Sequence, residues 1–301
     1  MRKLRRNLPV ALAIILASLS SSCGLISRTR LIHRNGKPVT QATPPLSATR
    51  DELNDRIARM YNAINSFQAT VDMIPSKGSV YKGQITEYKD VRAFILFRKP
   101  ADIRIQAQAP VIRTQLFDMV SDGTQFRLLY NPDSLFVEGS NSAPATSKSA
   151  MENLRPGAFL SSMLIRPADP ATEAPALMDL TDEDNTLYAL TFLRKGPNGE
   201  LLAHFARSVW FDRLDLSIVR QIVYDEDEAI VSDTHYAKWT PYNGVLFPAH
   251  IGLNRWKDGY GVVMDIVDMK MNLALTDDKF VLNQPEGSKL KIIGDPKQET
   301  R

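Results

Sequence analysis

The sequence predicts a mainly β (α+β) protein, built on one large, curved antiparallel sheet with two helices over one of its faces. Three observations lead to this prediction. Apolar and polar residues alternate with a period of two in about ten or eleven segments. Turn-forming residues separate many of these segments at short intervals. Apolar residues at helical spacing occur in two places, one before the first strand and one in mid-chain.

The first helix is expected at the start of the folded part. Thr49 and Glu52 have the spacing of a capping box, in which each side chain bonds to the backbone amide of the other residue. Apolar residues then recur on one helical face, namely Leu53, Ile57, Met60, Tyr61 and Ile64. Polar residues occupy the opposite face, so the helix can cover an apolar sheet.

The expected strands form a meander. The turns Ser121–Gly123 and Asn131–Ser134 are only three and four residues long. Connections this short join antiparallel strands, because parallel strands need a much longer crossover. The expected strands span residues 67–73, 91–97, 103–109, 115–120, 125–130, 135–138, 187–193, 201–211, 218–224 and 262–272.

Two stretches interrupt this pattern. Residues 139–150 form a small, polar loop, and the apolar-faced stretch 151–165 follows, with a second helix expected after Pro156, whose fixed φ suits a first helical turn. Residues 166–186 are acidic and contain prolines, so we expect an excursion from the sheet.

The N-terminus has the features of an export signal. Basic residues at positions 2, 3, 5 and 6 precede the 12-residue apolar run Leu8–Leu19 and three serines. A basic start, a short apolar stretch and a small-residue exit are typical of a signal peptide, whereas a spanning helix requires about 20 apolar residues. We therefore expect residues 1–22 to be removed on export.

Cys23, the single cysteine, follows directly and excludes an internal disulfide. The junction resembles the lipobox of bacterial lipoproteins, in which leucine and two small residues precede a cysteine, although Leu19 stands one place early. The resemblance implies that Cys23 carries acyl chains, which anchor a protein durably. Gly24 follows in place of the aspartate that retains lipoproteins at the inner membrane, which implies the outer membrane. The alternative is a chance cysteine beside an ordinary cleavage site.

Residues 23–46 are expected to form the lipidated N-terminus and a flexible tether, because they carry four cations, no acid and no apolar periodicity. Such a tether reaches about 25 to 30 Å. The whole chain has a net charge of +3, but without the cations of leader and tether the folded part, residues 47–301, carries about −5. This charge argues against a nucleic-acid-binding protein.

From about residue 49 to residue 287 the sequence resembles the LolA/LolB-like outer-membrane lipoprotein carriers and receptors. The resemblance depends on the order and spacing of short motifs rather than on an active-site signature. They are Phe67-Gln68-Ala69, Lys99-Pro100, Ile103-Arg104, Asp122-Gly123 with Phe126, Leu154-Arg155-Pro156, Trp210-Phe211-Asp212, Ile218 to Tyr224, Tyr236, Gly244 to Pro248, Asn272-Leu273 and Phe280.

The resemblance implies an unclosed half-barrel of antiparallel strands, with helices lying as a lid over its apolar concave face. Such a face suits acyl chains, which need dry volume rather than oriented polar groups. We expect the ligand-binding residues of the cavity and lid to be Ile103, Ile105, Phe126, Leu128, Phe159, Leu160, Met163 and Leu164. The alternative is a closed core without a ligand, since most of these positions would be apolar in any sheet.

Motifs of catalysis or metal binding are scarce. The chain has no GxSxG, HExxH or P-loop motif, and Gly259-Tyr260-Gly261 lacks the third glycine of a dinucleotide turn. The cluster Asp225–Glu228 lacks the glycine and the glutamate of a calcium loop, so a solvated hairpin turn is expected there. His204, His235 and His250 have no local metal spacing. We expect no enzymatic activity, no cofactor and no metal.

These inferences describe a lipid-anchored protein of the outer membrane that faces the periplasm. It is expected to be a monomer that binds an acylated or apolar ligand, such as a lipoprotein in transit or a lipid, and that has a role in lipoprotein sorting. The expected partners are the membrane and other lipoproteins, and no nucleic acid. The alternative is an accessory lipoprotein of an envelope complex, with the same fold, a filled core and no ligand.

Overall fold

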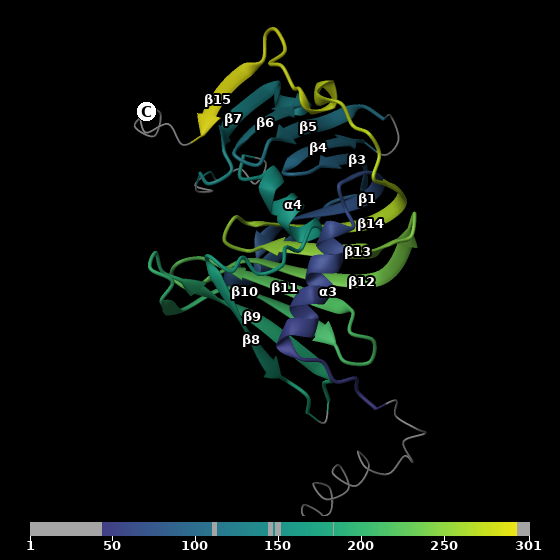
Figure 1. The fold of residues 1–301 in the computed structure, drawn as a ribbon. Coiled ribbons are helices and arrows are strands. Elements are labelled where there is room, and N and C mark those ends of the chain that lie inside the picture. The colour runs from purple at the N-terminus through teal and green to yellow at the C-terminus, as the bar shows by residue number, and fades with distance from the viewer. Residues whose placement is uncertain (1–43, 110–112, 144–146, 148–151, 183, 294–301) are drawn as a thin grey trace, which may run out of the picture. The chain divides into compact units, whose positions relative to one another are not determined.

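The sheet is organised around its first strand. The computed structural model describes residues 44–293 except 110–112, 144–146, 148–151 and 183. Strand β1 (Ser66–Ser79) pairs antiparallel with β3 (Val91–Arg98) on one side and with β14 (Tyr260–Met271) on the other. The first strand therefore lies in the middle of the sheet, and two arms extend from it (Figure 1).

The first arm is a meander that runs outward from β1 to β7, which pairs with the edge strand β15. Short 3-10 turns lie at three places, η1 (Val80–Lys82), η2 (Asn131–Asp133) and η3 (Asp277–Phe280). The short strand β2 pairs only with the end of β1. The remaining strands of this arm follow in chain order, and the set comprises β2 (Gln84–Glu87), β4 (Asp102–Gln108), β5 (Gln115–Ser121), β6 (Gln125–Tyr130) and β7 (Leu135–Ser140).

The second arm is built from its far edge inward. After helix α4 (Pro156–Met163) the chain reaches the opposite edge and returns strand by strand until β14 meets β1. Its other strands are β8 (Glu173–Asp179), β9 (Leu187–Lys195), β10 (Leu201–Asp212), β11 (Ile218–Tyr224), β12 (Ile230–Tyr242) and β13 (Val245–Arg255). This topology brings the two chain-distant meanders into one sheet.

The sheet is an unclosed half-barrel, as expected, because its edge strands β8 and β15 (Lys289–Ile293) do not pair with each other. The expected strand number was too low, since the sheet has 15 strands in the described part of the chain. The pairing is also not purely antiparallel, because β15 runs parallel to β7. The unexpected strands are β2, β8, β12, β13 and β15. In β12 the polar residues Ser232, Asp233 and Thr234 are all buried, which hides the alternation.

The expected excursion at residues 166–186 was wrong in part, because Glu173–Asp179 is the edge strand β8. Pro175 lies within it, and an edge strand tolerates proline because one side of its backbone needs no partner. Arg207 on β10 donates hydrogen bonds of 2.9 and 2.7 Å to Glu173 and further bonds to the carbonyl oxygens of Arg166 and Pro167. The acidic stretch is thus attached to the sheet.

Both expected helices are present and lie over the same face of the sheet (Figure 1). Helix α3 (Arg50–Asn62) begins at the expected capping box of Thr49 and Glu52, and it packs near β8 and β9. Helix α4 contacts β4, β5 and β13, so it bridges the two arms. Neither of these two α-helices, the only ones in the described residues, has the length and apolar character needed to cross a membrane.

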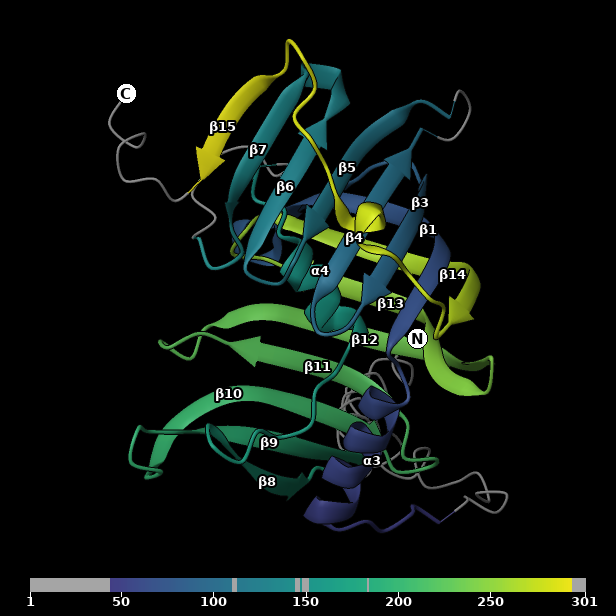
Figure 2. The ribbon, with the colours of Figure 1, turned by 45° about the horizontal axis from the view of Figure 1, so that its top comes forward.

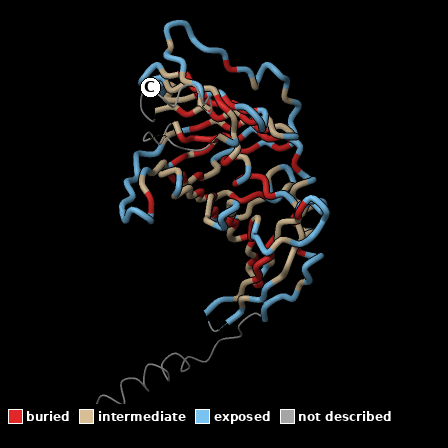
Figure 3. Tube along the Cα trace, turned by 90° about the vertical axis from the view of Figure 1, so that its left-hand side faces the viewer, coloured by how far each residue is buried: buried red, intermediate tan, exposed pale blue. Residues whose placement is uncertain are grey.

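A continuous apolar core lies between the concave face and the two helices. Buried residues run through the interior of both arms in Figure 3, and exposed residues gather at the loops. The described residues from Pro45 onward form one compact unit, and Leu46 exchanges hydrogen bonds with the backbone and the side chain of Arg213. The expected signal peptide, Cys23 and the tether up to residue 43 lie outside the described residues.

The segment that joins β14 to β15, residues 272–288, crosses the outer, convex face of the first arm (Figure 2). Three arginines on β3, β4 and β6 donate hydrogen bonds to its carbonyl oxygens. The pairs are Arg98 with Leu275 at 2.9 Å, Arg104 with Lys279 at 2.9 Å, and Arg127 with Leu282 at 3.4 Å. These contacts lead the chain across the strands to β15, which then pairs with the edge strand β7.

Candidate functional site

The residues expected to form the cavity and lid lie in one apolar cluster. The four strand residues are buried, with exposed fractions of 0% for Ile103 and Ile105, 2% for Phe126 and 1% for Leu128. The lid residues Phe159, Met163 and Leu164 are also buried, and Leu160 is partly buried against the cluster. The structure therefore brings the eight residues together as a filled core, and their contact with a ligand stays a prediction.

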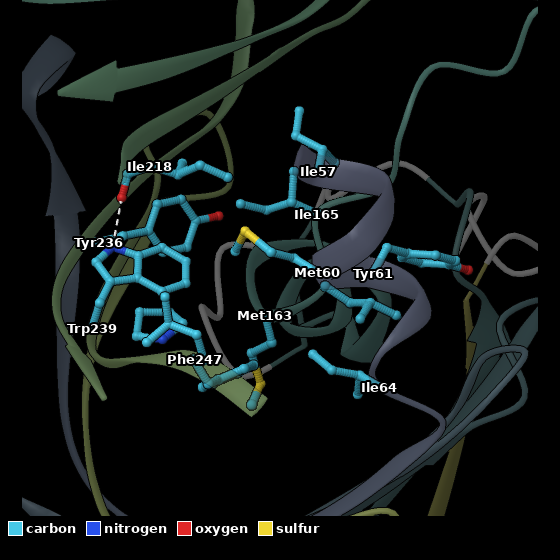
Figure 4. A pocket seen from close by; sticks show the side chains of 13 residues that line it. Ile57, Met60, Tyr61, Ile64, Met163, Ile165, Ile218, Tyr236, Trp239 and Phe247 are labelled. Carbon is cyan, nitrogen blue, oxygen red and sulfur yellow. Dashed lines mark hydrogen bonds between the residues drawn. The ribbon is translucent and has the colours of Figure 1, made fainter. Parts of the chain in front are cut away.

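A narrow space remains between the two helices and the second arm, and we call it the lid seam. In Figure 4 the side chains of Met60 on α3 and Met163 on α4 point toward the aromatic rings of β12 and β13. The volume of the seam is about 20 Å³, which suffices for a water molecule but not for an acyl chain. It is lined by Ile57, Met60, Tyr61, Ile64, Met163, Leu164, Ile165, Ile218, Tyr236, Trp239, Leu246, Phe247 and Pro248.

Side chains from the sheet satisfy the C-terminal end of α4. The last carbonyl groups of a helix have no partner within it. The hydroxyl of Tyr236 donates a hydrogen bond of 2.8 Å to the carbonyl oxygen of Ser162, and the amide of Gln221 donates one of 3.1 Å to that of Ser161. Burial raises the pKa of Tyr236, so its hydroxyl remains a donor. Two residues that are far away in the sequence thus hold this end of the lid.

The N-terminal end of α4 is held by another set of contacts. The side-chain oxygen of Asn141 accepts a long hydrogen bond of 3.4 Å from the amide of Gly157. The guanidinium group of Arg155 donates to the carbonyl oxygens of Glu152 and Leu154 and lies 5.0 Å from the centre of the Phe126 ring. Burial lowers the pKa of Arg155. The lid helix, only 8 residues long, is therefore fastened to the sheet mainly by apolar packing and a few hydrogen bonds.

A larger space lies at one end of the half-barrel, beyond the N-terminal end of α4, and we call it the end cleft. Its volume is about 380 Å³, within the ordinary range of small-ligand sites, roughly 300 to 1,000 Å³. Most of its lining is apolar or aromatic and none of it is acidic. The lining residues are Met73, Pro75, Ser76, Lys77, Tyr88, Lys89, Val91, Leu116, Phe117, Tyr130, Leu154, Phe159, Tyr260, Gly261 and Val262.

The end cleft continues the concave face of the sheet. Phe67, Ala69, Val71 and Met73 alternate inward along β1, and the same alternation carries on to Pro75 and Lys77. Pro75 and Lys77 pair with Val262 and Tyr260 of β14, which also line the cleft. Phe159 of α4 lines the cleft and Met163, one helical turn later, lines the lid seam. The lid helix therefore separates the two spaces.

Tyr260 contributes to the lining of this cleft. The residue is 2% exposed, and its hydroxyl is buried beside the backbone of Arg155. Burial raises its pKa to about 12, so the hydroxyl is protonated at neutral pH. The sequence indicated Tyr260 only as part of an incomplete dinucleotide turn. The signal that could have identified the cleft is the inward alternation of β1, which continues past Met73 to a lysine.

None of the three histidines in the described part of the chain lines the cleft. His204, His235 and His250 lie within 3.5 Å of Glu228, Asp233 and Asp265, respectively. No three side chains of metal-ligating type are gathered anywhere in the described ranges. The cluster Asp225–Glu228 forms the hairpin turn between β11 and β12, with the Asp225 carboxylate accepting hydrogen bonds from the amides of Asp227 and Ala229.

No protein-family model matches the sequence, and no curated protein matches it either. Solved structures of the same fold do exist. A DUF1329 family protein from Desulfovibrio piger is 15% identical, with a TM-score of 0.50 over 79% of this chain and 98% of its own. A LolA superfamily protein from Nitrosomonas europaea is 14% identical, with a TM-score of 0.50 over 78% of this chain and 99% of its own. The chain therefore has the LolA-like fold, an unclosed half-barrel under a helical lid.

Proposed function

We propose that this protein is a lipid-anchored, periplasm-facing lipoprotein of the outer membrane that binds an acylated or apolar ligand by non-covalent burial. One observation carries the proposal. The apolar end cleft, of about 380 Å³, continues the concave face at the place where the eight-residue helix α4 covers it. The LolA-like fold, shared with a protein of that superfamily, supports a role in lipoprotein sorting.

The ligand enters by the end cleft and extends under α4. The seam of about 20 Å³ accepts no chain while the lid is closed, so a long acyl chain displaces α4 from the sheet. Each methylene that a ligand buries contributes about 0.8 kcal/mol. A pair of long chains thus supplies enough free energy to replace the packing of Phe159 and Met163 on the strands. The protein carries out no chemical reaction, and its partners are acylated ligands and other lipoproteins.

The test uses the full exported chain with Cys23→Ala, which lacks acyl chains of its own, purified from the periplasm without detergent. We expect mass spectrometry of an organic extract to find bound lipid or lipopeptide. We also expect the neutral fluorophore N-phenylnaphthylamine to brighten on addition and to be displaced by a fatty acid. Absence of both bound lipid and fluorophore protection would refute the ligand-binding function.

A pair of variants on β3 and β14, the two strands that flank β1, locates the site. Val91→Trp fills the end cleft, and we expect it to reduce fluorophore binding at least several-fold. Val267→Trp is the control, because Val267 is 52% exposed and does not line the cleft. If both variants bind as the parent does, the ligand does not occupy the end cleft.

The filled core favours a second candidate. Ile103, Ile105, Phe126 and Leu128 are at most 2% exposed, which is what an accessory lipoprotein with a closed core requires. Such a protein acts through its surface in an envelope complex and binds no lipid. The extraction and fluorophore experiments separate the two functions, because only the carrier binds in both.

A further inference from the structure

The mouth of the end cleft carries two lysines. Lys77 and Lys89 both line the cleft and both are exposed. No described residue forms an ion pair with either of them, whereas the neighbouring Arg92 pairs with Asp72 at 2.7 Å. The lining contains no aspartate or glutamate. The cleft therefore has two positive charges at its opening, in a folded part whose net charge is about −5.

The position of Lys77 on the sheet is unusual. Lys77 continues the inward alternation of β1 after Met73 and Pro75, and Lys89 stands two residues before the cleft-lining Val91. An inward cation can block unwanted pairing at a sheet edge, but Lys77 lies on the central strand and has partners on both β2 and β14. Edge protection therefore does not explain Lys77.

Hydroxyl groups accompany the two cations. Tyr260 lines the cleft, and its hydroxyl is buried beside the backbone of Arg155. Tyr88 and Tyr130 line it as well. Lysine ammonium groups and tyrosine hydroxyls are donors suited to carboxylate or phosphate oxygens, and the remaining lining is apolar. The combination fits a molecule with a charged end and a hydrocarbon end.

We infer that the end cleft binds an amphiphile with an anionic head group, whose head contacts Lys77 and Lys89 and whose acyl chain lies against Val91, Phe117 and Val262. This inference rests on the proposed function, since it assigns the ligand class of the same site. The shared chemistry is an anionic oxygen group on an acyl chain, and both fatty acids and phosphate-bearing lipids have it.

The experiment compares three ligands of equal chain length on the full exported Cys23→Ala chain. Palmitate carries a carboxylate, palmitoyl-lysophosphatidic acid a phosphate, and monopalmitoylglycerol no charge. Each ligand is added below its own critical micelle concentration, and its binding is measured by the displacement of N-phenylnaphthylamine. We expect at least one anionic ligand to bind about five- to tenfold more tightly than the neutral one, a ratio that decreases with added salt. The preferred anion identifies the head group.

The double variant Lys77→Gln/Lys89→Gln should remove this preference and leave the affinity for monopalmitoylglycerol unchanged. Lys82→Gln/Lys270→Gln is the control, because it changes the charge equally at two exposed lysines that do not line the cleft, and it should keep the preference. Equal binding of all three ligands to the parent chain, or an unchanged preference in the Lys77/Lys89 variant, would overturn the inference and leave the proposed function intact. Failure of all three ligands to bind would overturn the proposed function itself.

Discussion

The hydroxyl of Tyr236 on β12 donates a 2.8 Å hydrogen bond to the carbonyl oxygen of Ser162, the penultimate residue of α4. The bond joins α4, which bridges the two arms, to a strand of the second arm, across 74 residues of sequence. The bond is therefore expected to stabilise the fold and, under the proposed function, to keep α4 closed over the sheet.

Tyr236→Phe should lower the free energy of unfolding by about 1 to 2 kcal/mol, because a buried carbonyl group loses its donor while the ring packing is kept. The melting temperature should fall by a few degrees. We also expect faster hydrogen exchange in residues 156–165. Tyr81→Phe is the matched control, since Tyr81 is 64% exposed and should change neither measurement. Equal exchange in the parent and Tyr236→Phe chains would show that this bond does not fasten the lid.

Asp233 should make the fold sensitive to acid. Burial alone would raise its pKa, but hydrogen bonds from Arg220 and His235 outweigh this effect and lower the pKa to about 2. The folded pKa is thus below the unfolded value of 3.8. The resulting stability, about 2 kcal/mol, is present above pH 4 and is lost as the pH falls toward 2.

Urea unfolding at a series of pH values between about 6 and 2 measures this contribution. Asp233→Asn should be less stable than the parent at neutral pH and should lose less stability between pH 4 and pH 2. Asp268→Asn, at an exposed position on β14, should keep the acid dependence of the parent. The same acid dependence in Asp233→Asn would refute the assignment.

Arg104 should be among the most sensitive residues of the convex face. It donates hydrogen bonds of 3.0 and 2.7 Å to Asp118, whose side chain is 4% exposed, and a third to the carbonyl oxygen of Lys279. Arg104→Met leaves a buried carboxylate without its cation, so we expect a loss of about 3 to 5 kcal/mol in urea unfolding.

The double variant Arg104→Met/Asp118→Leu should recover most of that loss, because no unpaired charge remains. Both variants should show faster hydrogen exchange in residues 273–284, which lose the bond at Lys279. Arg127→Met is a control, since the pair Arg127–Glu138 is half exposed and should contribute no more than about 1 kcal/mol. A double variant as unstable as the single one would show that packing, rather than charge, explains the effect.

Cys23→Ala should abolish metabolic labelling with radioactive palmitate and release the protein from the membrane fraction, because the thiol is the expected site of acylation. Cys23→Ser should behave in the same way. Fractionation of the labelled parent chain on a sucrose gradient tests the outer-membrane location. A Cys23→Ala protein that stays membrane-bound would refute the lipid anchor.

The sequence alone determined the local features of this protein. The capping box of Thr49 and Glu52, the start of α4 at Pro156 and ten of the 15 strands follow from periodicity and turn residues, which act over a few neighbouring positions. Of the five strands that it missed, β12 has buried polar residues, β13 contains the adjacent buried residues Phe247 and Pro248, and β2, β8 and β15 lie at an edge. In these places alternation is weak because only part of the strand faces the core.

Only the tertiary structure decided which strands meet and where space remains. Alternation predicts that Ile103 and Phe126 face inward, but it does not predict whether a helix or a ligand covers them, since both are apolar. The end cleft likewise depends on Lys77 and Tyr260, which lie 183 positions apart and become neighbours only through the register of β1 and β14. Such contacts result from the pairing of strands that are distant in the sequence and from the way side chains fill the interior. A local sequence pattern specifies neither of them.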